Sequence, residues 1–158
     1  MNPDEALRET LQLVARAMAP ARHDWWIVAS AACRLHGIDS GAVRDVDVLL
    51  DEHDLAAVLV PLGLSPAAGT SDGLFRSRCF VSWDGAPLTV EFFAGFELCE
   101  AGQWSEVRLQ TREWRGLDGL ELPVPQRGEL ADLLRRFGRP KDLARADRLS
   151  PSGPFPSR

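Results

Sequence analysis

The sequence has few cysteines, no long apolar run and no excess of positive charge. Its three cysteines are far apart and form no C-x-x-C pair, which argues against a disulfide framework and against a cysteine-based zinc site. No apolar run is long enough to span a bilayer, and the acidic, amphipathic start MNPDEALRE is unlike a signal peptide. The net charge of −5 does not favour a protein that coats nucleic acid or a membrane surface. We therefore expect a cytoplasmic protein with reduced thiols.

The remaining composition is typical of a globular protein. With 158 residues, of which 45% are apolar and 26% charged, the chain is long enough to bury a core. We expect a core domain over residues 1–125 and a C-terminal helical segment over 126–149. Residues 150–158 hold three prolines and no periodicity, which predicts a disordered tail.

Helical and strand patterns alternate along the chain. Apolar spacing with the period of a helix predicts helices over 3–20, 31–36, 51–62, 129–137 and 140–149. Runs of β-forming residues predict strands over 25–28, 46–50, 74–83, 87–93, 107–114 and 120–124. Asp84-Gly85, between two of these strands, is a strong hairpin signal. This order predicts an α/β or α+β domain with a mixed β-sheet flanked by helices.

Two carboxylates alternate with valines in the predicted strand DVDVLL. Strand alternation places Asp45 and Asp47 on one face, with Val46 and Val48 on the other. Two like charges so close together repel each other, and their burial is costly unless a cation neutralises them. Mg²⁺ prefers such oxygen ligands together with substrate phosphates. The pair is therefore a candidate metal site; the alternative is an acidic strand face that meets water.

Two other features favour the metal interpretation. Glu91 is the single carboxylate in the apolar strand LTVEFF, where its burial requires a partner. Ala29 and Ser30 end one predicted strand and begin a helix, so their small side chains and backbone N–H groups are suited to receive a phosphate.

Together, these segments resemble the nucleotidyltransferase superfamily, whose fold is shared by DNA polymerase β and the aminoglycoside and lincosamide nucleotidyltransferases. WWIVASAACRLHGIDSGAVRDVDVLL is similar to the family's strand, small-residue turn, helix and D-x-[DE] strand, and LTVEFF to its third-carboxylate strand. LPVPQRGELADLLRRFGRPKDLARADRL is similar to the closing segment of small bacterial members, including abortive-infection types. The resemblance covers roughly residues 25–50, 86–94 and 122–149.

The resemblance implies the nucleotidyltransferase fold and a metal-dependent enzyme that moves a nucleoside monophosphate from an NTP, such as ATP, to an acceptor hydroxyl. Asp45 and Asp47 would hold Mg²⁺ or Mn²⁺, and Glu91 would complete a second metal site or act as the base. The acceptor would be a small molecule such as an antibiotic, a tRNA end or a protein side chain.

The resemblance also implies the phosphate contacts. Ala29 and Ser30, through the Ser30 side chain and neighbouring N–H groups, would hold the β- and γ-phosphates, and Arg44 and Lys141 would add cationic contacts. Two positions depart from the family pattern. Ala29 stands where the family has glycine, and Leu134 where small members often have lysine. These departures motivate an alternative, a degenerate member that binds nucleotide or a partner without catalysis.

Two further polar features have simpler interpretations. His36, just before the helix-ending Gly37, is interpreted as a packing or capping residue. The run Asp51-Glu52-His53-Asp54 resembles a metal-binding sequence, but it begins a predicted helix, where acidic side chains complement the dipole. We interpret it as a solvated first turn.

Overall fold

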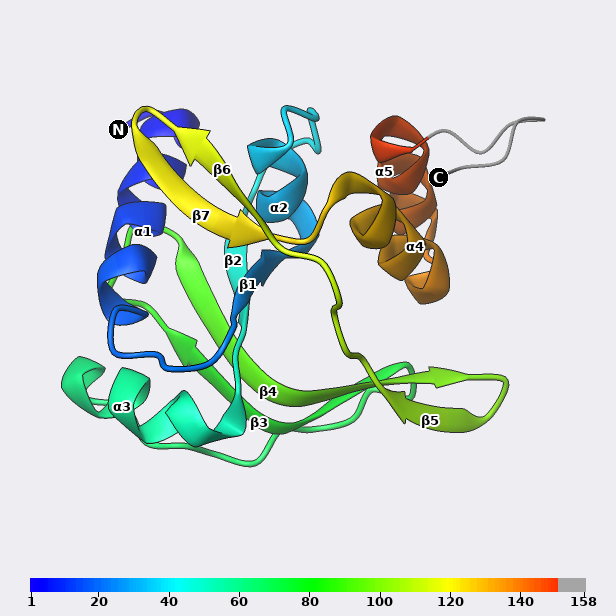
Figure 1. The fold of residues 1–158 in the computed structure, drawn as a ribbon, viewed down its shortest axis with the longest axis horizontal. Coiled ribbons are helices and arrows are strands. Elements are labelled where there is room, and N and C mark those ends of the chain that lie inside the picture. Colours follow the sequence, from blue (N-terminus) through cyan, green and yellow to red (C-terminus); the bar gives the residue numbers. More distant parts are fainter. Residues whose placement is uncertain (151–158) are drawn as a thin grey trace.

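The computed structural model describes residues 1–150, so the predicted tail, except for Ser150, lies outside the described residues. A mixed β-sheet runs through the molecule, with α1 and α3 at one end and α4 and α5 at the other (Figure 1). The helices are α1 (Pro3–Ala17), α2 (Ala29–Leu35), α3 (Leu55–Leu59), α4 (Arg127–Phe137) and α5 (Pro140–Leu149), with 3₁₀ turns η1 (Glu52–Asp54) and η2 (Val60–Leu62). The strands are β1 (Trp26–Val28), β2 (Asp45–Leu49), β3 (Phe75–Trp83), β4 (Thr89–Glu100), β5 (Gln103–Glu106), β6 (Glu113–Leu117) and β7 (Leu120–Val124).

The main sheet has the strand order β1-β2-β4-β3, and β5 pairs with the far part of β4. Strands β2 and β4 are parallel, whereas β1, β3 and β5 run antiparallel to their neighbours. Strands β6 and β7 form a separate hairpin. The prediction of a mixed sheet flanked by helices is therefore confirmed.

The first helix forms as its sequence predicts. The Asn2 side chain accepts a hydrogen bond from the Glu5 backbone N–H at 2.8 Å, and Pro3 occupies the first helical position, where it needs no hydrogen-bonded N–H. Leu7, Leu11 and Val14 lie on one face of the helix and are buried. That apolar face fixes α1 against the sheet.

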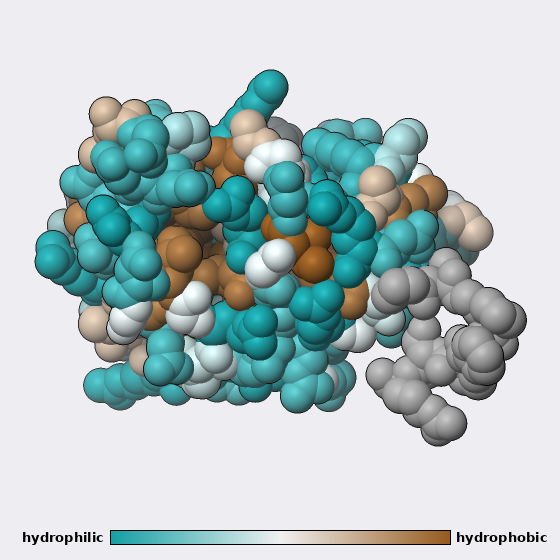
Figure 2. All heavy atoms as spheres, turned by 90° about the horizontal axis from the view of Figure 1, so that it is seen from above, coloured by the Kyte–Doolittle hydropathy of each residue, from teal (hydrophilic) through white to brown (hydrophobic). Residues whose placement is uncertain are grey.

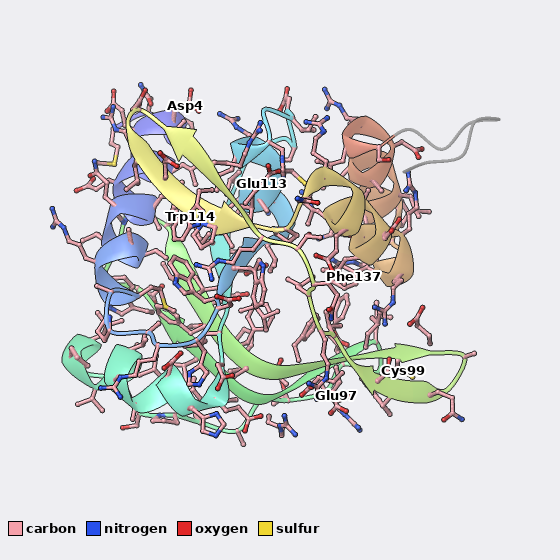
Figure 3. All side chains as sticks on the ribbon, in the orientation of Figure 1. Asp4, Glu97, Cys99, Glu113, Trp114 and Phe137 are labelled. Carbon is pink, nitrogen blue, oxygen red and sulfur yellow. The ribbon has the colours of Figure 1, made fainter. Side chains whose placement is uncertain are left out.

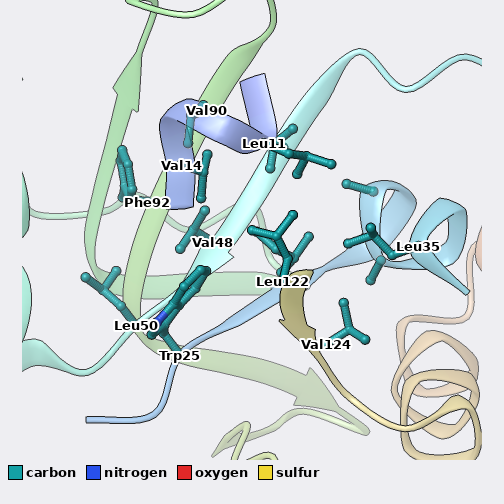
Figure 4. Packing of buried hydrophobic residues seen from close by; sticks show 14 of the residues in the cluster. Leu11, Val14, Trp25, Leu35, Val48, Leu50, Val90, Phe92, Leu122 and Val124 are labelled. Atoms are coloured by element: carbon teal, nitrogen blue, oxygen red, sulfur yellow. The ribbon is translucent and has the colours of Figure 1, made fainter. Parts of the chain in front are cut away.

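The largest core cluster lies on one face of the sheet, and alternation along the strands determines which residues enter it. Val48 on β2 and Val90 and Phe92 on β4 are fully buried there. They pack in one cluster with Leu11 of α1 and Leu122 of β7 (Figure 4). Because these strands alternate, the intervening side chains, including the three predicted carboxylates, point to the other face.

The two C-terminal helices pack against each other and against the rest of the domain. Gly138 between them adopts a left-handed φ of 76°, which glycine tolerates, and ends α4. Arg127 on α4 donates hydrogen bonds to the carbonyl oxygens of Leu149 and His36. Phe137 extends from α4 toward the space between these helices and the sheet (Figure 3).

Three predicted elements differ from the structure. The helix predicted over 51–62 is split into η1, the short α3 and η2. The strand predicted over 107–114 is wrong for 107–112, because Glu129 accepts the N–H groups of Gln110 and Thr111 that a strand partner would bind. Strand β4 also extends to Glu100 and turns into β5, which the sequence patterns did not indicate.

Figure 2 shows the molecule from above relative to Figure 1. This surface is mainly hydrophilic, with apolar side chains visible in a recess near the middle. Within residues 1–150, no helix is long and apolar enough to cross a membrane. The cysteines of this part are unpaired, and Cys33 and Cys79 are buried.

Candidate metal and nucleotide site

The three predicted carboxylates meet on the face of the sheet opposite the core. Asp47 on β2 and Glu91 on β4 are register partners across the parallel pair, and Asp45 lies two residues earlier on the same face. One carboxylate oxygen from each residue lies within 4.8 Å of the others. The carboxylates are therefore close enough together to share one cation.

Asp47 has an environment that a cation would satisfy. Its Oδ1 atom is buried without a hydrogen-bond partner in the described part of the chain. Burial, then hydrogen bonding to Glu91 and the nearby negative charges, raise the pKa of Asp47 well above its usual range. An orphaned buried oxygen beside two further carboxylates is a donor set that suits a hard divalent cation such as Mg²⁺ or Mn²⁺. The residues present therefore fit such an ion.

The carboxylates open into a cleft of about 720 Å³ between the sheet, the loop before β2 and the two C-terminal helices. All seven predicted site residues line this single cleft: Ala29, Ser30, Arg44, Asp45, Asp47, Glu91 and Lys141. Segments far apart in the sequence therefore contribute to one concave surface, as in most small-molecule sites.

Ala29 stands at the turn from β1 into α2 with a left-handed φ of 59°. An L-residue pays about 1–2 kcal/mol for this conformation, whereas glycine adopts it without steric cost. This backbone conformation is the physical reason to expect glycine at this position, as in the pattern of the nucleotidyltransferase superfamily. Beside it, the Ser30 carbonyl accepts a hydrogen bond from the Ser40 hydroxyl at 3.1 Å, which ties the loop before β2 to this turn.

Three cationic side chains of the cleft have no acidic partner. Arg44 and Lys141 make no ion pair or hydrogen bond with any of residues 1–150, and Arg145 donates only to the Ser40 carbonyl oxygen. Lys141 and Arg145 are four residues apart on α5 and so share one helix face. Lys141 is also the only lysine in the chain. These cations leave positive charge available in the cleft that holds the carboxylates.

Arg139 is a cleft residue that the sequence analysis did not select. Its guanidinium donates to both carboxylate oxygens of the buried Asp142, at 2.6 and 3.1 Å. It also lies 5.0 Å from the centre of the Phe75 ring, a cation–π distance. Asp142 thus holds Arg139 in place, and the GRPKD run was the signal that could have identified it.

The second departure from the family pattern lies outside the cleft. Leu134 is fully buried in the main core, whereas its neighbour Leu133 lines the cleft. A lysine at position 134 would therefore be buried among apolar side chains. Its absence removes no charge from the cleft of this protein.

An apolar shelf lies beside the carboxylates on the same sheet face. Leu49 and Phe93 are register partners two residues beyond Asp47 and Glu91, and Phe80 pairs with Phe93 from the other side. Phe96 packs edge-on against Phe93 at 5.1 Å. All four line the cleft, so one wall offers aromatic surface to an organic ligand.

His36 has the structural role that its position predicts. It ends α2, is buried, and its Nε2 atom lies 2.7 Å from the Pro125 carbonyl oxygen. Burial lowers the pKa of this imidazole, so it is neutral near pH 7.

No protein-family model and no curated protein sequence matches this chain. Its structure is similar to that of a Thermotoga maritima protein assigned as a nucleotidyltransferase, with a TM-score of 0.65, 20% identity and coverage of 85% of this chain and 86% of that one. It is also similar to ANT(2″)-Ia in complex with adenylyl-2″-tobramycin, with a TM-score of 0.55, 11% identity and coverage of 89% and 86%. The solution structure of the same antibiotic-resistance factor gives a TM-score of 0.52, 12% identity and coverage of 89% and 81%. The chain therefore has the nucleotidyltransferase fold, as the sequence resemblance implied.

Proposed function

We propose that this protein is a metal-dependent nucleotidyltransferase that moves a nucleoside monophosphate from an NTP to an acceptor hydroxyl. The observation that carries the proposal is the convergence of Asp45, Asp47 and Glu91 within one cleft that also holds unpaired cations. Carboxylates on one side and cations on the other are what metal-bound phosphates require.

Each side chain has a role that follows from its place. Asp45 and Asp47 would hold Mg²⁺ or Mn²⁺, and Glu91 would add a ligand to a second ion or take the proton of the acceptor hydroxyl. Bound divalent ions supply charge stabilisation at the attacking and leaving oxygens of the displacement. Arg44 and Lys141 contact the triphosphate, and their positive charge offsets the charge of the phosphates.

The Ala29–Ser30 turn contributes through its backbone and the Ser30 hydroxyl. The hydrogen bond from the Ser40 hydroxyl to the Ser30 carbonyl holds the loop before β2 against this turn. Arg139, fixed by Asp142 and packed over Phe75, lies near Asp47, whose negative form it stabilises. Arg139 therefore positions charge beside the metal ligands.

The charges of the cleft also constrain the acceptor. Among the described lining residues, Asp72 is the one acidic side chain outside the triad, and its carboxylate already accepts the N–H groups of Leu74 and Phe75. Five basic side chains line the cleft and would repel a polycation, and no further carboxylate of residues 1–150 is available there to bind it. We propose an acceptor without several positive charges, whose apolar part rests on the shelf around Phe93.

A second candidate is a degenerate member that binds nucleotide without transferring it. The left-handed Ala29 favours this candidate, because the strained turn is where the phosphates would approach most closely. In this case, the carboxylates and cations still bind a metal–NTP complex, and the chemical step is lost.

Transfer of label from [α-³²P]NTP in the presence of Mn²⁺ tests the proposal. The four NTPs are each incubated with the protein and with small-molecule, RNA and protein extracts, and labelled products are separated by class. We expect label in one class, and its loss in Asp47→Asn and Glu91→Gln. Metal-dependent NTP binding without any transfer would favour the degenerate candidate, and no binding at all would contradict both.

A further inference from the structure

A second group of metal-ligating side chains lies away from the cleft, at the other end of the β1/β2 strand pair. His23 precedes β1, and Asp51 and His53 follow β2. One potential ligand atom from each residue lies within 4.8 Å of the others, and the two imidazole rings are 5.5 Å apart. Two of the three histidines of the chain thus meet, although they are far apart in the sequence.

A buried carboxylate orients the first histidine. Asp54 accepts the N–H groups of Arg22 and His23 at 3.1 and 3.0 Å, and its Oδ2 atom lies 3.2 Å from His23 Nδ1. Asp54 is 3% exposed, so the interpretation of the run 51–54 as a solvated turn is wrong for this residue. A carboxylate on one imidazole nitrogen is the common support for a metal on the other nitrogen.

The remaining two ligands have atoms left for a metal. Asp51 caps η1 through Oδ1, which accepts the His53 N–H at 2.8 Å and lies 2.7 Å from His53 Nδ1. Its Oδ2 atom and the Nε2 atom of His23 make no hydrogen bond within residues 1–150, and zinc would take the place of the proton between His53 Nδ1 and Asp51. Capping of the turn therefore accounts for only one of the two Asp51 oxygens.

We propose that His23, Asp51 and His53 form a zinc site separate from the nucleotide cleft. Two imidazoles and one carboxylate suit Zn²⁺, with water in the fourth position, whereas Mg²⁺ prefers an all-oxygen set like the triad. Because Trp26 and Leu49 are register partners at this end of β1 and β2, the bound zinc ties together the segments that flank these two strands. The site stabilises the strand pair that carries Asp45 and Asp47.

Calorimetric titration of the metal-free full-length chain with Zn²⁺ alone tests the site. The titration uses Asp47→Asn as the background, so that the triad does not compete for zinc. We expect one Zn²⁺ per chain, and binding at least ~10-fold weaker when His23→Gln or His53→Gln is added. Glu52→Gln is the matched control, because Glu52 is in the same turn but pairs with Arg78; it should leave zinc binding unchanged.

Thermal unfolding separates loss of zinc from loss of folding. His23 and His53 are exposed, so both variants should unfold at the background temperature in EDTA. Saturating Zn²⁺ should raise the midpoint of the background protein by about 2–4 °C and that of the histidine variants by less. No zinc binding to the background protein, or binding that the histidine variants leave undiminished, would overturn the proposal.

Discussion

Asp47 and Glu91 are register partners on the parallel strands β2 and β4. The buried Asp47 Oδ1 atom has no hydrogen-bond partner among the described residues. The parallel pairing brings together two carboxylates that are far apart in the sequence. Their mutual repulsion and the burial of Asp47 make the metal-free arrangement costly. A divalent ion would offset this unfavourable electrostatic free energy, and the proposed activity depends on that ion.

The first prediction concerns stability and pH. Burial in the folded state raises the pKa of Asp47, so folding favours the protonated carboxyl group. The stability that this contributes is fully present below the unfolded-state pKa of about 4. It is lost as the pH rises through the raised pKa of the folded state. Asp47→Asn should remove this slope and, in EDTA at pH 8, stabilise the protein by about 1–2 kcal/mol. Urea unfolding from pH 4 to pH 9 measures both effects.

Mg²⁺ provides the complementary measurement. It should stabilise the wild-type protein at pH 8 and have little effect on Asp47→Asn. Asp132→Asn, on the exposed face of α4, is the control and should behave as wild type does. If Mg²⁺ stabilised the wild-type protein and Asp47→Asn equally, the ion would bind at a site that does not include Asp47, which contradicts the prediction.

The second prediction concerns the strained turn. Ala29→Gly should stabilise the fold by about 0.5–1 kcal/mol, because glycine adopts the left-handed φ without a Cβ clash. Ala144→Gly, at an exposed position within α5, should destabilise it by about 1 kcal/mol. Urea unfolding compares the two; a loss of stability in both would mean that position 29 carries no strain.

The third prediction uses Lys141, the only lysine of the chain. ATP that carries an acyl group on its γ-phosphate should transfer this group to the Lys141 amine with release of ATP, and peptide mass spectrometry locates the label. Excess ATP with Mg²⁺ should protect it. Lys141→Arg should lose the label but retain ATP binding, because the positive charge remains. Labelling confined to the N-terminal amine would argue against a triphosphate at this position.

The fourth prediction concerns the acceptor. Tobramycin should not be nucleotidylated, since the cleft places Arg44, Arg139 and Lys141 where a polycation would need carboxylates. The assay incubates tobramycin, ATP and Mn²⁺ with protein whose ATP binding has been verified, and measures products by mass spectrometry. Formation of adenylyl-tobramycin would refute the charge argument while supporting the transferase itself.

Local patterns predicted most of the elements and selected seven residues that line one cleft. Alternation in DVDVLL and LTVEFF placed the carboxylates on the correct strand faces, because burial of valine and phenylalanine fixes the register. The absence of a strand at 107–112 depends on Glu129 of α4, and the left-handed φ of Ala29 depends on the path from β1 into α2. Such long-range and backbone effects leave no periodic signal in the sequence.

The cluster of His23, Asp51 and His53 shows the same limit. The run 51–54 was visible in the sequence, but His23 is brought to it only by the pairing of β1 with β2. Likewise, Arg139 enters the cleft because Asp142 holds its guanidinium over Phe75. Each of these residues acquires its partner from the tertiary fold.

The most direct test of the central claim is a crystal structure of the protein soaked with Mn²⁺ and a non-hydrolysable NTP. We expect anomalous density for Mn²⁺ between Asp45, Asp47 and Glu91, with the triphosphate reaching toward Arg44 and Lys141. Mn²⁺ or nucleotide bound only outside this cleft, or a triad that binds no ion at saturating Mn²⁺, would contradict it.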